Sequence, residues 1–236
     1  MSRALVYGNG KSRLKWDLNQ ELQDNITTWG CNRIYNDTVV DNLVAVDYWI
    51  QHMVYESGYA KTNKCWFLDW QILPVDFDIT PMRLEYYNHQ ENEKNTGGKV
   101  VRGKDQPPLK GLYITWVDEN DMVEDIDFPK EWGSGTTAIH LACQQGAKQI
   151  YLIGFDLSAN PINNVYEEEQ KKFKINDDNR PFRFDWTNEL KTTIKEYPNT
   201  NFIWVDPSET TLDFFNYSSN NLTYDTYENI RRKICR

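Results

Sequence analysis

The sequence predicts an α/β protein with a mostly parallel central sheet, and three observations predict it. Short, uninterrupted apolar runs, typical of strands covered on both faces, alternate with segments that suit helices. Several of these runs end in a polar residue, where parallel strands deliver side chains to a ligand crevice. The 236 residues contain no linker-like stretch, so we expect a single domain over residues 1–236.

The predicted elements follow from these runs in chain order. Strands of the central sheet are expected at 3–7, 26–29, 43–46, 150–153 and 202–205. Further strands are expected at 65–68 and 112–117, with another candidate at 82–87. Helices are expected at 48–59, 165–174 and 184–197. Because strands and helices alternate, a parallel sheet covered by helices is favoured.

The stretch from 132 to 158 has the clearest pattern in the chain. Gly133-Ser134-Gly135 opens a helix with Ser134 as the expected N-cap, and Gly146 is placed to end it. The apolar run at 150–153 then leads into Gly154-Phe155-Asp156, which places an acid at the end of a buried strand. Ser134, Gly135 and Asp156 are therefore candidate ligand-binding residues.

The first predicted strand leads into a second candidate loop, Gly8-Asn9-Gly10-Lys11-Ser12. A strand followed by G-x-G lets the backbone approach a ligand closely and leaves amides free to bind phosphate. We therefore predict nucleotide binding at Gly8, Asn9, Gly10 and Ser12. The third glycine of a dinucleotide fingerprint and the ending of a P-loop are both missing. An ordinary tight turn explains these glycines about as well when they stand alone.

Three early strands finish in polar residues, namely Asn9, Asn32 and Asp47. In a parallel sheet one edge gathers all of these side chains, so we expect them to line one crevice together with Ser134 and Asp156. A simple turn role is the alternative for each asparagine taken separately. Their coincidence favours a site.

Composition narrows the classes of partner and compartment. A formal net charge of -9 disfavours nucleic acid and anionic membranes as partners. Cys31, Cys65, Cys143 and Cys235 lack C-x-x-C spacing, so free thiols are expected. With no signal peptide or spanning segment visible, we expect a cytoplasmic protein. Homo-oligomerisation is left open.

Several segments have compositions that suggest loops. Residues 88–111 are polar and rich in Gly, Pro and Lys, which predicts a flexible lid or flap over a site; an ordered hairpin around Gly97-Gly98 is the alternative. The acidic run at 118–127 is expected to be a solvated loop. The aromatic C-terminal tail at 214–236 is expected to wrap the body or form a lid.

A metal site is not predicted. Asp76-x-Asp78 and Asp125-x-Asp127 match the D-x-D pattern that holds a divalent ion for sugar nucleotides. In a chain with this much aspartate, about two such matches arise by chance, so the pattern carries little weight.

Three motifs taken together resemble a known family. G-N-G-K-S at 8–12, C-N-x-x-Y at 31–35 and the S-G to G-F-D stretch at 134–156 resemble the bacterial sialyltransferases of glycosyltransferase family 42. They also resemble the related DUF115 group, which includes archaeal 6-hydroxymethylpterin diphosphokinases. The resemblance covers 3–47 and 132–157. It implies a single Rossmann-like domain with a flexible lid, no bound cofactor, and metal-independent transfer from a nucleotide sugar, such as a CMP-sugar, to an unknown acceptor.

The resemblance also implies roles for individual residues. Asn9 and Gly10 match the loop that contacts the nucleotide, and Asn32 matches an asparagine that faces the nucleotide and the reaction centre. Ser134 and Gly135 match a loop that contacts the donor. Tyr166 lies roughly where the family keeps a tyrosine that supports the departing phosphate, and a surface aromatic is an equal alternative.

The sequence departs from the family at the catalytic base. The family's base histidine precedes the helix expected at 184–197, but residues 179–186 contain no histidine. Asp185 is the candidate replacement, and Arg180 and Arg183 are candidates to neutralise a phosphate. The histidines of the chain are His52, His89 and His140; His140 falls on a core-facing helix and is expected to be structural.

Three functions therefore compete. The leading hypothesis is a nucleotide-dependent glycosyltransferase with Asn32, Tyr166 and Asp185 as catalytic candidates. The second keeps the fold but transfers diphosphate from ATP to a pterin-like alcohol, a reaction that needs Mg²⁺. The third is a non-catalytic binding or structural member, which the missing histidine favours.

Overall fold

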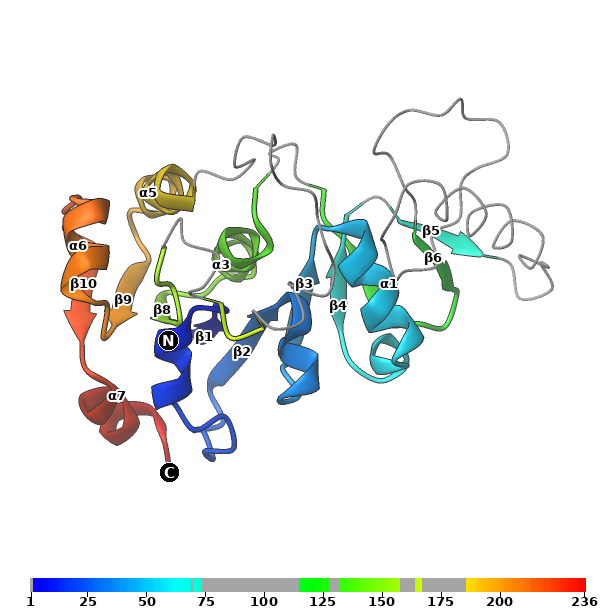
Figure 1. Cartoon of the computed structure of the whole chain (residues 1–236), viewed down its shortest axis with the longest axis horizontal. Coiled ribbons are helices and arrows are strands. Elements are labelled where there is room, and N and C mark those ends of the chain that lie inside the picture. The colour runs from blue at the N-terminus through cyan, green and yellow to red at the C-terminus, as the bar shows by residue number, and fades with distance from the viewer. Residues whose placement is uncertain (1, 69, 74–114, 128–131, 158–163, 167–185) are drawn as a thin grey trace.

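The computed structural model describes residues 2–68, 70–73, 115–127, 132–157, 164–166 and 186–236. Its centre is an eight-stranded sheet in the order β10-β9-β8-β1-β2-β3-β4-β7 (Figure 1). Every neighbouring pair of strands in this sheet is parallel. The architecture is a Rossmann-like α/β fold, which confirms the predicted fold class.

The strands of this sheet are β1 (Arg3–Tyr7), β2 (Ile26–Cys31), β3 (Asn42–Ala45), β4 (Cys65–Phe67), β7 (Val123–Asp125), β8 (Gln149–Ile153), β9 (Asn201–Val205) and β10 (Leu222–Asp225). A separate two-stranded parallel sheet pairs β5 (Trp70–Leu73) with β6 (Thr115–Asp118). The α-helices are α1 (Tyr48–Glu56), α3 (Ser134–Gln144), α5 (Trp186–Glu196), α6 (Glu209–Phe215) and α7 (Tyr227–Ile234). Short 3-10 helices are η1 (Lys11–Lys15), η2 (Asn32–Asn36) and η3 (Tyr59–Lys61).

Helices cover both faces of the sheet, which explains why its inner strands are largely apolar. On one face α3, α5 and α6 pack on the sheet through buried side chains that include Ile139, Leu190 and Phe215. On the other face α1 and α7 pack through Ile50 and Ile230, next to the short 3-10 helices. The molecule therefore has three layers, with the sheet in the middle (Figure 1).

The order of the strands reverses at β1. From β1 the chain proceeds to β2, β3 and β4 on one side, and from β8 it proceeds to β9 and β10 on the other. Tyr7 pairs with both Gly30 and Ile153, so the carboxyl ends of β2, β1 and β8 lie level with one another. Open α/β sheets bind ligands at such a reversal, outside the carboxyl ends of the strands.

The sequence correctly predicted the main strands of the central sheet and the glycines at two helix ends. The strands expected at 3–7, 26–29, 43–46, 150–153 and 202–205 all belong to the central sheet, as does the strand expected at 65–68. Gly146 ends α3 with φ 89°, and Gly58 follows α1 with φ 79°. Both glycines adopt the left-handed conformation that favours this residue at helix ends.

One expectation about strands was wrong. The acidic run at 118–127 was expected to be a loop, but it contains β7, which closes one edge of the sheet with Glu124 and Asp125 exposed. Charged side chains suit an edge strand because they discourage pairing with another chain. The strand expected at 112–117 is confirmed over its described residues as β6, which pairs with β5 outside the central sheet.

The C-terminal segment completes the body of the protein, and it is not a separate lid. β10 extends the sheet beside β9, and α7 covers it with Tyr227, Ile230 and Ile234 buried. These apolar positions in α7 have helical spacing within an otherwise polar sequence, so one narrow stripe faces the core.

Several expectations lie outside the described residues. These are the strand at 82–87, the flap at 88–111, most of the helix at 165–174, and the residues Asp76, Asp78, His89, Arg180, Arg183 and Asp185. Among the described helices, none combines the length and apolar character that a membrane span requires.

Candidate functional site

The candidate site lies at the carboxyl edge of the sheet, where loops from four strands and one helix meet. Asn9 follows β1, and its Nδ2 donates to the Cys31 carbonyl at the end of β2 over 3.3 Å. The Val46 amide, which follows β3, donates to Ser134 Oγ at the start of α3 over 3.1 Å. These bonds join the predicted residues Asn9 and Ser134 to the ends of neighbouring strands.

The glycine loop after β1 packs against the turn after β8. The Gly8 amide donates to the Ile153 carbonyl over 2.7 Å, and the Gly10 amide donates to the Gly154 carbonyl over 2.8 Å. A Cβ on Gly8 would stand 2.9 Å from the Gly154 carbonyl carbon and closer still to its oxygen. The glycines therefore allow two backbones to touch. The expectation that these amides are free for phosphate was wrong, because the chain itself supplies their acceptors.

Asp156 holds the same loop from the other side. Its carboxylate accepts from the Ser12 amide over 3.0 Å and also from the Ser12 hydroxyl. A Cβ on Gly10 would stand 2.5 Å from the Asp156 carboxyl carbon, so the glycine makes room for this carboxylate. Ser12 and Asp156 thus bind each other at the site, and their contacts shape the loop.

Asn32 has the most unusual environment of the predicted site residues. It is the first residue after β2 and has φ 54°, in the left-handed region that Asn tolerates better than most side chains. Its Oδ1 is buried and accepts no hydrogen bond from any described residue. Buried polar atoms are nearly always paired, so this acceptor requires an explanation.

The start of α3 differs from its prediction in one respect. Gly133 is the N-cap, and Ser134 is the first helical residue. Ser134 is buried, and its hydroxyl accepts from Val46 instead of capping its own helix. Position 134 therefore links α3 to β3, which sets where the positive end of this helix lies along the carboxyl edge.

Gly135 and Asp47 also lie along this edge. A Cβ on Gly135 would stand 3.3 Å from the Phe155 ring and 3.8 Å from Cys31 Sγ, so the first turn of α3 lies close to the ends of β8 and β2. Asp47 is the N-cap of α1, two residues beyond the end of β3. Both residues therefore adjoin strand ends of the central sheet, and their roles in ligand binding stay predictions.

A carboxylate of the chain already occupies part of the amino end of α3. Glu189, a buried residue of α5, accepts from the Gly133 amide over 3.2 Å and from the Thr136 hydroxyl. An anion is stabilised at the amino end of a helix by the unpaired amides and the helix dipole. Sequence inspection missed Glu189, whose only signal was a glutamate at a buried position in the first turn of an amphipathic helix.

Glu189→Gln should lower the free energy of unfolding by about 1–2 kcal/mol, because an amide replaces the charge-assisted bonds at this helix end. Urea denaturation at neutral pH measures the change. Glu228→Gln is the matched control, because Glu228 is also in a first helical turn but is largely exposed beside Arg232. The control should change stability by no more than about 0.5 kcal/mol. Equal effects of the two substitutions would contradict the assigned role of Glu189.

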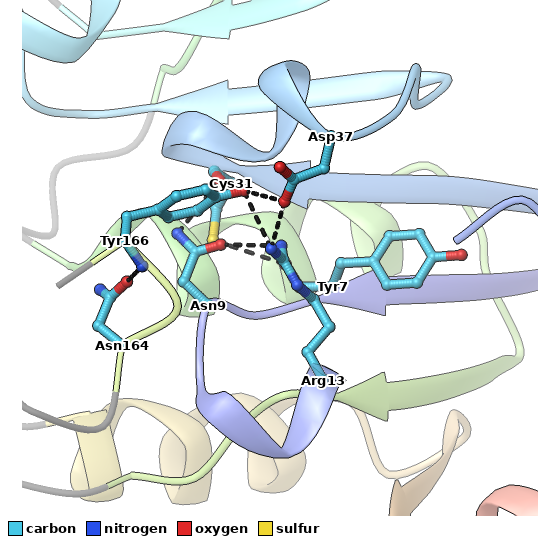
Figure 2. A network of polar contacts seen from close by, with 7 residues as sticks. All are labelled: Tyr7, Asn9, Arg13, Cys31, Asp37, Asn164 and Tyr166. Carbon is cyan, nitrogen blue, oxygen red and sulfur yellow. Dashed lines mark hydrogen bonds and ion pairs between the residues drawn. The ribbon is translucent and has the colours of Figure 1, made fainter. Parts of the chain in front are cut away.

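A polar network centred on Arg13 connects the loops after β1 and β2 (Figure 2). Arg13 is 2% exposed, and it donates to Asn9 Oδ1 over 3.2 Å and to Asp37 Oδ2 over 2.7 Å. It also donates to the Tyr166 hydroxyl over 2.9 Å, and that hydroxyl donates to Asp37 over 2.5 Å. None of the sequence motifs pointed to Arg13 or Asp37.

Tyr166 belongs to this network and is only partly exposed, so it is not an isolated surface aromatic. Its segment is tied to the glycine loop by a bond from the Val165 amide to the Asn9 carbonyl over 2.9 Å. The pKa of Tyr166 is raised, chiefly by burial, and Asp37 raises it further while Arg13 opposes the shift. At neutral pH the phenol therefore keeps its proton and remains a donor.

Two other reactive residue types near this edge have structural environments. Burial raises the pKa of the Cys31 thiol to about 12, so Cys31 is not a thiolate nucleophile at neutral pH. His140 is buried in α3, with its ring 5.4 Å from that of Tyr197 and 5.8 Å from that of Trp132. The structural role expected for His140 fits this aromatic packing.

Metal ligands do not gather in the described part of the chain: it holds no group of three His, Cys, Asp or Glu side chains arranged to bind an ion. Asp125 and Asp127 are exposed at the end of the edge strand β7. Two surface hollows, of about 210 and 300 Å³, are lined by residues other than the predicted site residues; one is lined by Arg3 and Asn42, the other by Leu18 and Val39.

Comparison with known proteins gives distant structural similarity. No family model matches the chain, and no curated protein sequence matches it. The sialyltransferase CstII from Campylobacter jejuni with cytidine-5'-monophosphate is 12% identical, with a TM-score of 0.43 over 93% of this chain and 86% of that one. The sialyltransferase CST-II with a trisaccharide acceptor and CMP is 12% identical, with a TM-score of 0.44 over 86% and 80%. At this level the chain is similar to these structures, and the similarity assigns neither a family nor an activity.

Proposed function

We propose that this protein is a nucleotide-dependent transferase that uses a nucleotide-activated sugar as its donor. The observation that carries the proposal is Asn32, a left-handed residue at the carboxyl edge whose buried Oδ1 lacks a donor among the described residues. Left-handed residues other than glycine are uncommon, and they cluster at functional sites. A hydroxyl or amino group of a bound nucleotide would satisfy this acceptor.

Asn9 offers the complementary group beside it. Its Oδ1 accepts from Arg13 and one N–H donates to Cys31, while no described residue accepts from the second N–H. The site therefore presents an amide acceptor on Asn32 and an amide donor on Asn9. Such a pair suits the hydroxyl and amide groups of a nucleoside.

The charges around the site favour a donor with few phosphate groups. Among the described residues, Arg13 is already paired with Asp37, and the amino end of α3 already holds the Glu189 carboxylate. A monophosphate-linked donor, such as a CMP-sugar, brings less negative charge to this edge than a diphosphate-linked one. We place its phosphate between the Tyr166 hydroxyl and the first amides of α3, at Ser134 and Gly135.

Catalysis in this proposal rests on stabilising the departing phosphate and on orienting the acceptor. The Tyr166 hydroxyl, which donates to Asp37 in the structure, would turn to the departing phosphate when the donor binds, and Asn32 orients the reacting end of the donor. Asp185 remains the candidate base, and it lies outside the described residues.

The cytoplasm is the proposed compartment. All four cysteines are free thiols, which is the state that a reducing compartment maintains.

A thermal-shift screen tests the proposal first. CMP, UMP, AMP and GMP are compared, and a ligand at a hundred times its dissociation constant should add about 2.7 kcal/mol of stability. We expect CMP to stabilise the protein most. No stabilisation by any nucleotide or nucleotide sugar would overturn the proposal.

Turnover assays then separate the competing reactions. Release of CMP from a CMP-sugar in the presence of EDTA supports glycosyl transfer. Mg²⁺-dependent release of AMP from ATP in the presence of a pterin alcohol would instead indicate diphosphate transfer. Nucleotide binding without turnover of any donor would identify a binding protein.

A further inference from the structure

Arg13 and Asp37 form an ion pair beside the candidate site, with a buried guanidinium and a partly exposed carboxylate, and neither residue belongs to a motif. The Arg13 side chain is 2% exposed and that of Asp37 is 35% exposed, with 2.7 Å between Nη2 and Oδ2. An isolated ion pair that is partly open to solvent contributes little to stability, since water screens its attraction. Their partners in the network therefore suggest what the pair does.

Arg13 determines which end of the Asn9 amide faces it. A guanidinium can only donate, so the Asn9 atom at 3.2 Å from Nη1 must be the oxygen. The amide nitrogen then faces the Cys31 carbonyl, as the bond of 3.3 Å shows. With both of these bonds made, the second N–H of Asn9 has a fixed direction.

The same pair determines where the Tyr166 proton points. Arg13 donates to the phenolic oxygen over 2.9 Å, so this oxygen is an acceptor on that side. The hydroxyl proton is then directed to Asp37 Oδ2 over 2.5 Å. The guanidinium carbon also lies 5.3 Å from the centroid of the Tyr166 ring, which holds the ring in place (Figure 2).

We propose that Arg13, anchored by Asp37, is a positioning residue that sets the direction of the Asn9 amide and holds the Tyr166 phenol in place at the nucleotide site. The inference rests on the proposed function for the ligand and on geometry for the positioning. Lysine cannot replace arginine here, because a single ammonium lacks the planar fork that serves Asn9, Asp37 and Tyr166 together.

The test compares Arg13→Lys and Asp37→Asn with the unchanged protein, using CMP as the probe. Arg13→Lys keeps the charge but loses the fork, so CMP should bind roughly tenfold to a hundredfold more weakly, as expected for misplaced binding groups. Asp37→Asn keeps the shape and an acceptor oxygen, so it should weaken CMP binding several-fold. Arg231→Lys is the control. The guanidinium carbon of Arg231 also lies over an aromatic ring, 5.6 Å from the centroid of Trp16, but Arg231 belongs to α7 and is outside the site.

An NMR measurement without ligand tests the positioning directly. The side-chain NH₂ signals of Asn9 should be well dispersed in the unchanged protein and in Arg231→Lys. In Arg13→Lys they should shift or broaden, because the amide is free to flip. This readout shows whether the chain is folded and does not depend on the identity of the nucleotide.

The outcomes are distinct. Weaker CMP binding together with altered Asn9 signals supports the inference, as does a smaller loss in Asp37→Asn. Unchanged Asn9 signals and CMP affinity in Arg13→Lys would overturn it. Tighter CMP binding in Asp37→Asn would also overturn it, because Asp37 would then compete with the ligand phosphate for Arg13. If the unchanged protein binds no nucleotide, the proposed function fails, while the Asn9 signals still decide the positioning.

Discussion

Replacing Gly8 with alanine should lower the free energy of unfolding by at least about 3 kcal/mol, near the upper end of what overpacking costs. The new Cβ would overlap the Gly154 carbonyl, and it would also lie 3.3 Å from the Phe155 ring. A backbone carbonyl inside a hydrogen-bonded turn cannot move aside as a side-chain tip can. The Gly8 amide also donates to Ile153, so any shift would weaken the contact between β1 and β8.

The effect is measured by urea denaturation, from the midpoint at a constant slope. Gly58→Ala is a control for backbone strain alone, because Gly58 has φ 79° and a Cβ added there would meet only open space. That substitution should cost about 1–2 kcal/mol, the usual penalty of a left-handed alanine. If Gly8→Ala were as stable as Gly58→Ala, the turn after β8 would accommodate the new Cβ at little cost in stability. That result would contradict the prediction.

Substitutions of Asn32 should separate a turn residue from a ligand-binding residue. Asn32→Gly keeps the left-handed backbone and removes the amide, so stability should stay within about 1 kcal/mol of the unchanged protein. Asn32→Ala also removes the amide but adds backbone strain of about 1 kcal/mol. If Oδ1 binds the nucleotide, both variants should bind CMP about tenfold to a hundredfold more weakly, as loss of a buried hydrogen bond of about 1–3 kcal/mol requires.

Calorimetric titration with CMP and urea denaturation of the same samples give the two quantities. Asn216 is the matched control, since it is also left-handed, with φ 35°, but it is exposed at the end of α6. Asn216→Ala should lose stability and keep its affinity for CMP. Full affinity in Asn32→Gly would show that residue 32 serves only the turn, and it would remove the main support for the proposed function.

Local patterns predicted most of the framework. The strands at 3–7 and 150–153 are recognisable because burial on both faces demands continuous apolar runs. The ends of α1 and α3 are recognisable because Gly58 and Gly146 adopt positive φ angles there. β7 was not predicted, because an edge strand tolerates charged residues, and charged residues are also typical of loops.

The site was predicted in part. Asn9, Asn32 and Ser134 were expected at the carboxyl edge because each adjoins the end of a strand or the start of a helix, and the contacts of Asn9 and Ser134 join neighbouring elements there. Their ligand-binding roles remain predictions. Glu189, Arg13 and Asp37 were missed, because each is an ordinary charged residue in its own local sequence.

The sequence by itself determined where the chain extends, coils and turns, since those preferences depend on neighbouring residues. Only the tertiary structure decided which polar groups are already paired. The amides of Gly8 and Gly10 lie far along the chain from their acceptors near residue 154, and the amino end of α3 receives its carboxylate from α5. A hydrogen bond needs its partners within about 3 Å, a condition that folding imposes on residues distant in sequence.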